Sequence, residues 1–177
     1  MDSVNRQWRL RERPTGMVGV QHFEYREEAA PKAQDGEVLV RTLYLSFDPA
    51  MRAFLNDRSS YAAPQRVGEV MGAGAIAQVI ESRAKGFAAG DFVFGRFGWQ
   101  DYASAKGDTG VMKLSRGRQL TDYMGALGGT GLTAYIGMLE VGQAKSGETV
   151  VISGAAGATG SVAVQISRIV GCRTEGR

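Results

Sequence analysis

The first two thirds of the chain, residues 1 to about 115, are punctuated by short segments of alternating or β-branched residues. Turn signals rich in glycine, proline and aspartate separate these segments, for example at Arg13–Gly16, Gln34–Gly36 and Ala89–Asp91. No long 3.6-residue periodicity runs through this region, so the pattern predicts a small β-barrel or sandwich. The predicted strands are Gln7–Arg11, Gly19–Tyr25, Glu37–Leu45, Ala75–Glu81 and Asp91–Phe97.

The pattern changes near residue 118. Leu120–Leu127 and Leu132–Leu139 have helical patterns, and Thr130 is the predicted N-cap of the second helix. A β-branched strand, Thr149–Ser153, then leads into the glycine-rich turn Gly154–Gly160. The apolar positions from Ser161 to Val170 predict a helix that packs on a sheet, and strand, glycine turn and helix are the opening of a βαβ unit.

The glycine turn favours dinucleotide binding. Glycines at 154, 157 and 160 allow a tight reversal, close approach of a pyrophosphate and close packing of helix on strand. The N–H groups at the helix start, with the positive end of its dipole, attract phosphate. The predicted cofactor-binding residues here are Gly154, Gly157, Ala158, Thr159 and Gly160. The match to G-x-G-x-x-G is incomplete, because Ala155 occupies its first glycine position, and a purely structural turn is the alternative.

The second half of a dinucleotide fingerprint is not evident. An acidic residue at the end of a second strand would bind the ribose of NAD, whereas a basic group would accept the 2′-phosphate of NADP. Glu175 has roughly the right spacing, but only Cys172, Arg173 and Thr174 separate it from Gly171. We therefore expect no complete second strand and a solvated Glu175. A sheet of one strand cannot bury both of its faces, so we expect residues 149–177 to be poorly packed unless another chain completes their sheet.

Composition narrows the classes of function. Glycine makes up 25 of 177 residues, about twice its usual share of roughly 7%, while 44% hydrophobic and 22% charged residues are typical of a globular domain. A single cysteine excludes an internal disulfide and favours a cytoplasmic location. The net charge of +3 comes without a basic stripe, which argues against nucleic acid. We expect no secretory signal in residues 1–10, and no membrane span in the glycine-rich uncharged stretches.

Several local sequences resemble one enzyme superfamily. They are Gly36–Arg41, Leu45–Arg52, Gly86–Gly95, Gly98–Tyr102, Gly131–Tyr135 and the turn Gly154–Gly160. Together they resemble the medium-chain dehydrogenases/reductases, most closely the zinc-independent, NADPH-dependent alkenal, prostaglandin and curcumin double-bond reductases. The resemblance implies a GroES-like catalytic domain over residues 1–117. It further implies linker helices and the start of a Rossmann NADP-binding domain, its first β-α unit, over residues 118–177.

The resemblance also implies the chemistry. Hydride from NADPH reaches the β-carbon of an α,β-unsaturated ketone or aldehyde, and the protein stabilises the enolate. Catalytic residues remain unknown; the substrate-cleft candidates are Ser46, Asp48, Met51 and Arg52. The alternative for Asp48 and Arg52 is that they only form an ion pair with each other on the surface. Thr133 matches a position near the nicotinamide, where its hydroxyl would bond the carboxamide. The alternative is that this hydroxyl bonds a preceding carbonyl of its own helix.

No metal is expected. Zinc-using relatives carry a Gly-His-Glu motif, whereas this chain has Gly68-Glu69 without the histidine, and His22 and Cys172 alone provide too few N/S ligands. His22 is interpreted as a surface or packing residue, and Cys172 as a packing residue. Both Ala50 and Gly129-Thr130 depart from the sequences usual in relatives, so the shape of the pocket and the substrate are left open.

The resemblance leads us to expect a truncated form of a reductase about twice as long, inactive by itself, with a small-molecule enone or alkenal as substrate and a homodimer allowed for the longer form. NADPH quinone reduction is the nearest catalytic alternative. The other alternative is a non-catalytic GroES-like domain that self-associates, because Val150–Ile152 and Val162–Ile169 would leave apolar surface exposed.

Overall fold

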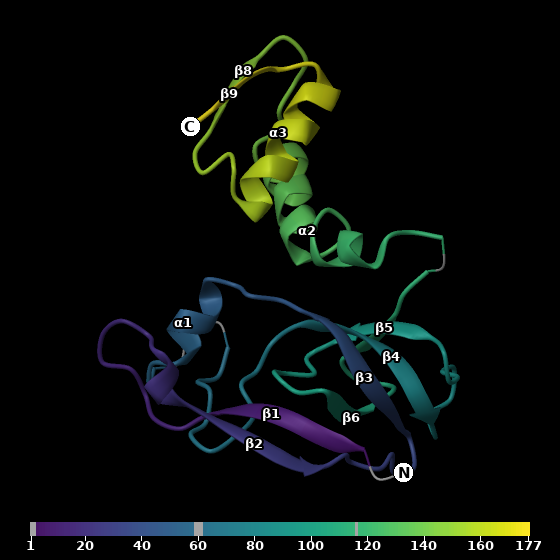
Figure 1. Cartoon of the computed structure of the whole chain (residues 1–177). Helices are drawn as coiled ribbons and strands as arrows, with labels where there is room; N and C mark the ends of the chain where they lie inside the picture. The colour runs from purple at the N-terminus through teal and green to yellow at the C-terminus, as the bar shows by residue number, and fades with distance from the viewer. Residues whose placement is uncertain (1–2, 59–61, 116) are drawn as a thin grey trace. The chain divides into compact units, whose positions relative to one another are not determined.

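The computed structural model describes residues 3–58, 62–115 and 117–177, and its contacts divide the chain into two compact units. The first unit comprises residues 1–116 and the second comprises residues 117–177. Each unit is described by itself below (Figure 1).

The first unit is built from antiparallel strands. A two-stranded ribbon pairs β1 with β2, and a curled five-stranded sheet has the order β6-β3-β4-β5-β7. One helical turn, α1 (Ala50–Phe54), follows β3, and a 3₁₀ turn at Val20–His22 precedes β2. The strands are β1 (Val4–Leu10), β2 (Phe23–Ala29), β3 (Glu37–Leu45), β4 (Ala75–Ser82), β5 (Phe92–Gly95), β6 (Tyr102–Lys106) and β7 (Val111–Lys113).

The sheet curls around a core made by alternating side chains. Val38 and Val40 of β3 are fully buried, and they pack with Ala75, Ala77 and Val79 of β4. Irregular pairing between Leu39 and Val40, and again between Thr42 and Tyr44, bends β3 against β4. The sequence predicted β3 with the observed bounds because this alternation is regular. The curled antiparallel sheet agrees with the GroES-like domain that the resemblance implied.

β1 is joined to the five-stranded sheet by a buried amide rather than by a continuous ladder. The Asn5 side chain is 1% exposed; its Nδ2 donates to the Tyr102 carbonyl at 2.9 Å and its Oδ1 accepts from the Tyr102 N–H at 2.9 Å. Nδ2 also donates to Gln100 Oε1 at 3.2 Å. Further along, the Trp8 N–H donates to the Trp99 carbonyl at 3.0 Å. These bonds hold the ribbon against the sheet.

The second unit contains a 3₁₀ turn (Leu120–Met124), α2 (Gly129–Tyr135), a π-helical segment (Ile136–Val141), β8 (Thr149–Ile152), α3 (Ala158–Val170) and β9 (Arg173–Gly176). α2 packs against α3, and α3 lies beside the β8–β9 pair, as Figure 1 shows. The hydrophobic core of this unit is small: the buried residues of its cluster are Ala134, Ile152 and Ala163. Ser167, also fully buried, lies one helical turn after Ala163.

The expectation of an incomplete second strand was wrong. β9 pairs in parallel with β8 over four residues, so the unit is a complete βαβ rather than one strand and one helix. Gly171 adopts φ +90° at the end of α3, which stops the helix within one residue and leaves room for the strand to begin at Arg173. Glu175 lies in this strand and forms an ion pair with Arg173 at 3.4 Å.

The helical predictions near residue 120 need smaller corrections. The Leu120–Leu127 segment forms only a 3₁₀ turn that ends at Met124. Thr130 is not an N-cap, because α2 begins at Gly129 with Gly128 as its N-cap. The Thr130 hydroxyl instead donates to the Gly125 carbonyl at 3.2 Å. In the first unit, the predicted Gly19–Tyr25 strand also needs a correction: the structure has a 3₁₀ turn at Val20–His22, and β2 begins only at Phe23.

Replacing Asn5 by leucine should destabilise the first unit by about 2–4 kcal/mol, because the Tyr102 N–H and carbonyl would both lose a buried partner. Both tryptophans of the chain, Trp8 and Trp99, lie in this unit, so urea unfolding followed by tryptophan fluorescence measures it. Gln34→Leu is the control: Gln34 is exposed, and its change should stay within about 0.5 kcal/mol. Equal midpoints for the two variants would contradict the structural role of Asn5.

Glu37 should make the first unit sensitive to acid. Hydrogen bonds from the Ser104 hydroxyl and from the Gln34 N–H lower the pKa of Glu37 below its ordinary value of 4.5. A lowered pKa in the folded state stabilises the protein while the carboxylate is ionised, and this contribution is lost as the pH falls through the folded pKa. Ser104→Ala should therefore reduce stability at pH 7, and the difference from the parent should shrink between about pH 5 and pH 3. A difference that is constant over this range in urea titrations would refute the assignment.

Candidate functional site

The glycine turn lies between β8 and α3, where the sequence placed it. Gly154 has φ +61°, a conformation that favours glycine, and its carbonyl accepts the Gly157 N–H at 2.9 Å. A Cβ added at Gly160 would overlap the Gly154 carbonyl oxygen and lie 2.9 Å from Ala155 Cα. Gly160 therefore lets α3 start directly over the turn. The positive φ explains the glycine at 154, and the close approach to the turn explains the glycine at 160.

The start of α3 presents free donors. Gly157 is its N-cap with extended backbone, and no side chain caps the helix. The N–H groups of Ala158, Thr159 and Gly160 belong to the first turn, which has no partners within the helix, and the Ser161 N–H is the first to bond back, to Gly157 at 2.8 Å. Such a cluster of N–H groups at the positive end of a 13-residue helix suits a phosphate group.

Thr133 lies on α2, also in the second unit. Its side chain is exposed, and its hydroxyl donates to the Gly129 carbonyl at 2.8 Å. The structure therefore has the helix-internal hydrogen bond that sequence analysis left as the alternative. Because the hydroxyl proton is used in that bond, the Thr133 oxygen keeps its lone pairs for a donor such as a carboxamide N–H.

The predicted substrate-cleft residues lie together in the first unit, around α1. The Ser46 hydroxyl donates to the Asp48 carboxylate. Arg52 donates to Asn56 Oδ1 at 2.8 Å and to the Gly16 carbonyl at 3.0 Å, so it joins α1 to the loop before β2 instead of pairing with Asp48. Met51 is 9% exposed and packs in a core cluster with Leu10 and Met71.

A hollow of about 320 Å³ lies over this segment. Asp48, Met51 and Arg52 line it, whereas Ser46 is not among its lining residues. Sequence analysis had not assigned its other walls, which are contributed by Val18, Phe23, Phe47, Pro49, Leu55, Met71 and Trp99. Phe47 and Pro49 lie within the Leu45–Arg52 sequence that carries the resemblance. Val18, Phe23, Met71 and Trp99 come from loops and strands far apart in the chain, so no local pattern predicted that they would line one hollow.

The remaining two residues that the sequence singled out have structural contacts. His22 Nδ1 lies 2.9 Å from the Gly19 N–H within the 3₁₀ turn. Cys172 is buried, and its thiol donates to the Lys145 carbonyl at 3.2 Å. Across the described residues, no group of three or more His, Cys, Asp or Glu side chains is arranged to hold a metal ion. Nor does that part of the chain contain a helix long and apolar enough to cross a membrane.

A GroES-like half-barrel followed by a βαβ unit with a glycine turn defines the class: the catalytic domain of a medium-chain dehydrogenase/reductase and the beginning of its Rossmann domain. The family described as the N-terminal domain of oxidoreductase matches residues 6–114, more than half of the chain, and the chain belongs to this family.

Known proteins agree with this assignment. The chain is 41% identical over 173 residues to the NADPH-dependent curcumin reductase of Escherichia coli, covering 97% of this chain and 50% of that protein. It is 34% identical over 172 residues to prostaglandin reductase 1 of Bos taurus, covering 96% and 50%. The crystal structure of CurA from Vibrio vulnificus in complex with NADPH superposes with a TM-score of 0.88 at 38% identity, covering 97% of this chain and 51% of that one. The chain thus spans about half the length of the relatives it matches.

Gly160→Ala should destabilise the β8–α3–β9 unit by about 1–3 kcal/mol, because the new methyl group must displace the backbone of Gly154 or Ala155. Hydrogen exchange measured by mass spectrometry on peptides from residues 149–177 should show faster exchange in this variant. Gly129→Ala is the matched control in the same unit, since nothing lies within 4 Å of a Cβ at that position. Similar exchange in the two variants would contradict the close approach at Gly160.

Proposed function

We propose that this chain provides the catalytic domain (residues 1–117) and the start of the NADP-binding domain (residues 118–177) of an NADP(H)-dependent oxidoreductase that reduces the C=C bond of α,β-unsaturated carbonyl compounds. The observation that carries the proposal is the glycine turn at the start of α3, in a chain 38% identical to a CurA whose structure contains NADPH. The names of the curcumin and prostaglandin reductases support the class of substrate.

The chain's own residues have distinct roles in this proposal. The N–H groups of Ala158, Thr159 and Gly160 bind the pyrophosphate, and the absence of a side chain at Gly154 leaves open space beside the turn for its approach. The Thr133 oxygen accepts a hydrogen bond from the carboxamide and so orients the nicotinamide ring. When bound, NADPH would supply the hydride for the β-carbon of the enone, and the α-carbon of the resulting enolate then takes up a proton, which gives the saturated ketone.

The apolar hollow beside α1 holds the substrate. Phe47, Met51 and Trp99 exclude water from it, while Asp48 and Arg52 are polar groups at its wall. Arg52 also donates to the carbonyl of Gly16, two residues before Val18, which is another lining residue of the hollow. Exclusion of water strengthens any hydrogen bond to the developing enolate oxygen.

A chimaera tests the proposal. Residues 1–173 of this chain, joined to the second half of the Escherichia coli curcumin reductase, should oxidise NADPH in the presence of an enone and yield the saturated ketone, identified by mass spectrometry. NADPH should be preferred over NADH. In the same chimaera Gly160→Ala should lower the rate of NADPH oxidation at least about tenfold, because the phosphate is no longer correctly positioned. Gly129→Ala should leave this rate unchanged.

Two results would contradict the proposal. A folded chimaera that leaves NADPH absorbance flat with enones would reject the activity, and turnover with quinones alone would replace it by quinone reduction.

Self-association is a second candidate function, favoured by the exposure of Val151 at 58% and of Ile169 at 84%. Light scattering that shows a monodisperse monomer of the 177-residue chain would count against it.

A further inference from the structure

Two arginines cross-link α1 to the loop that follows β1. Arg13, from the loop, reaches the end of α1, where its Nη1 donates to the Leu55 carbonyl at 3.0 Å and to the Asn56 carbonyl at 3.2 Å. Arg52, from α1, reaches in the opposite direction and donates to the Gly16 carbonyl at 3.0 Å. The loop, residues 13–18, is therefore bonded to the α1 segment at two separate points.

The 13–18 loop has few other anchors. Its residues form no backbone–backbone hydrogen bond with any part of the chain that the structure describes. Pro14 is the one buried residue of the loop, whereas Thr15, Gly16 and Met17 are exposed, Met17 by 91%. The position of the loop therefore depends largely on the two guanidinium groups.

α1 depends on Arg13 in turn. A helix of five residues is too short to be stable by itself, and its last carbonyls have no partners within the helix. An arginine that donates to these carbonyls satisfies them. The Arg13 side chain is 26% exposed, and its Nη2 also pairs with Asp57 at 3.3 Å. Asp57 is 85% exposed, so this ion pair contributes little and the two carbonyl bonds are the main contacts.

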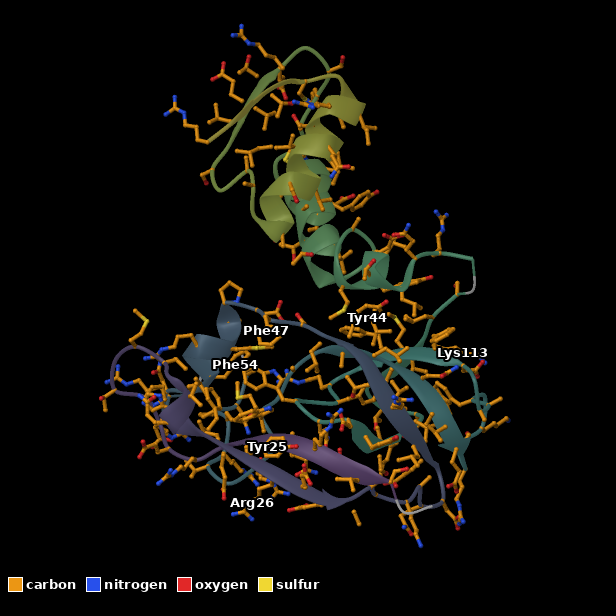
Figure 2. The ribbon with its side chains drawn as sticks, viewed as in Figure 1. Tyr25, Arg26, Tyr44, Phe47, Phe54 and Lys113 are labelled. Atoms are coloured by element: carbon orange, nitrogen blue, oxygen red, sulfur yellow. The ribbon has the colours of Figure 1, made fainter. Side chains whose placement is uncertain are left out.

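The cross-link ends on residues that line the hollow of about 320 Å³ beside α1, which we call the substrate hollow. Leu55, whose carbonyl accepts from Arg13, is 3% exposed and lines it. Val18, at the end of the loop, lines it too and packs against the core cluster that contains Leu55. Figure 2 shows the segment, with Phe47 just before α1 and Phe54 at its last residue.

Arg13 itself is not among the residues that line the substrate hollow. It is bonded to the backbone behind one lining residue, Leu55, and belongs to the loop that contains another, Val18. Its removal should therefore change the shape of the hollow without removing a group that touches the substrate.

We propose that Arg13 is a positioning residue for the substrate hollow: it holds the end of α1 against the 13–18 loop and so fixes Leu55 and Val18 relative to each other. The inference rests on the proposed function, because it takes the hollow as the substrate site. Arg13 acts on the binding of the enone and not on hydride or proton transfer. The alternative is a role in the stability of the first unit alone.

The cross-link is tested first in the 177-residue chain. Arg13→Met keeps most of the apolar stem and removes the guanidinium group. Hydrogen exchange of peptides from residues 48–57 should become at least about fivefold faster, because the end of α1 loses its donors. Peptides from β3 and β4 should exchange as in the parent. Arg83→Met is the matched control: Arg83 is also exposed and ion-paired, with Asp35 and Glu81, and its loss should leave residues 48–57 unchanged.

The positioning role is tested in the chimaera with the Escherichia coli curcumin reductase. Arg13→Met should raise KM for the enone at least about fivefold and leave kcat within about twofold, because it weakens substrate and transition state alike. KM for NADPH should not change. Arg13→Lys keeps the charge but not the planar fork, and should raise KM for the enone only about two- to threefold. Arg83→Met should leave both constants unchanged.

Two results would overturn the proposal. Unchanged exchange of residues 48–57 in Arg13→Met would remove the cross-link, and a lower kcat with an unchanged KM for the enone would assign Arg13 to stability alone. Should Arg13→Met fail to unfold cooperatively in urea, Arg13→Lys decides, and a KM equal to that of the parent would count against positioning. A parent chimaera inactive with enones would instead reject the proposed function, so the two failures are distinguishable.

Discussion

The packing of the first unit depends on how β1 is attached to the five-stranded sheet, because β1 is not one of the strands of that sheet. β1 pairs along its length only with β2, yet Leu10 at its end is fully buried in the cluster that includes Met51 and Met71. The buried amide of Asn5 supplies this attachment at one end, and the backbone bonds of Trp8 and Leu10 supply it further along. An amide can satisfy both the N–H and the carbonyl of Tyr102, which an apolar side chain at this position cannot do.

The attachment of β1 also determines the position of residues that line the cavities of the first unit. Because Leu10 packs on Met51, the position of β1 fixes α1, and with it the Asp48–Arg52 wall of the hollow. Because the Trp8 N–H donates to the Trp99 carbonyl, the same strand also determines one wall of a second cavity of the first unit, of about 930 Å³. Val18, Phe23, Phe47 and Trp99 line both cavities, so the two share a wall, and a change in the ribbon alters them together.

Backbone-determined features were predictable from the sequence, and features assembled from distant side chains were not. The alternation around Val38 and Val40 predicted β3, and the spacing of Gly154, Gly157 and Gly160 predicted the turn, because each pattern is local. β9 was missed since Arg173, Thr174 and Glu175 have no apolar pattern; Thr174 lies against α3 through a hydrogen bond to Ser167, at 2.9 Å, instead of through apolar burial. The second cavity, of about 930 Å³, was not predicted because Trp8, Tyr44 and Trp99, which line it, are separated by tens of residues in the sequence.

The second unit shows how a polar contact replaces apolar packing where a helix must lie close to a strand. Ser167 is fully buried on α3, and a larger side chain there would separate the helix from β9. α3 covers the face of the β8–β9 pair that contains Ile152, while Val151 on the other face is 58% exposed. Parallel strands are ordinarily covered on both faces. The geometry of the βαβ unit is therefore set by glycine and serine contacts on the α3 side, and Val151 is exposed on the other face.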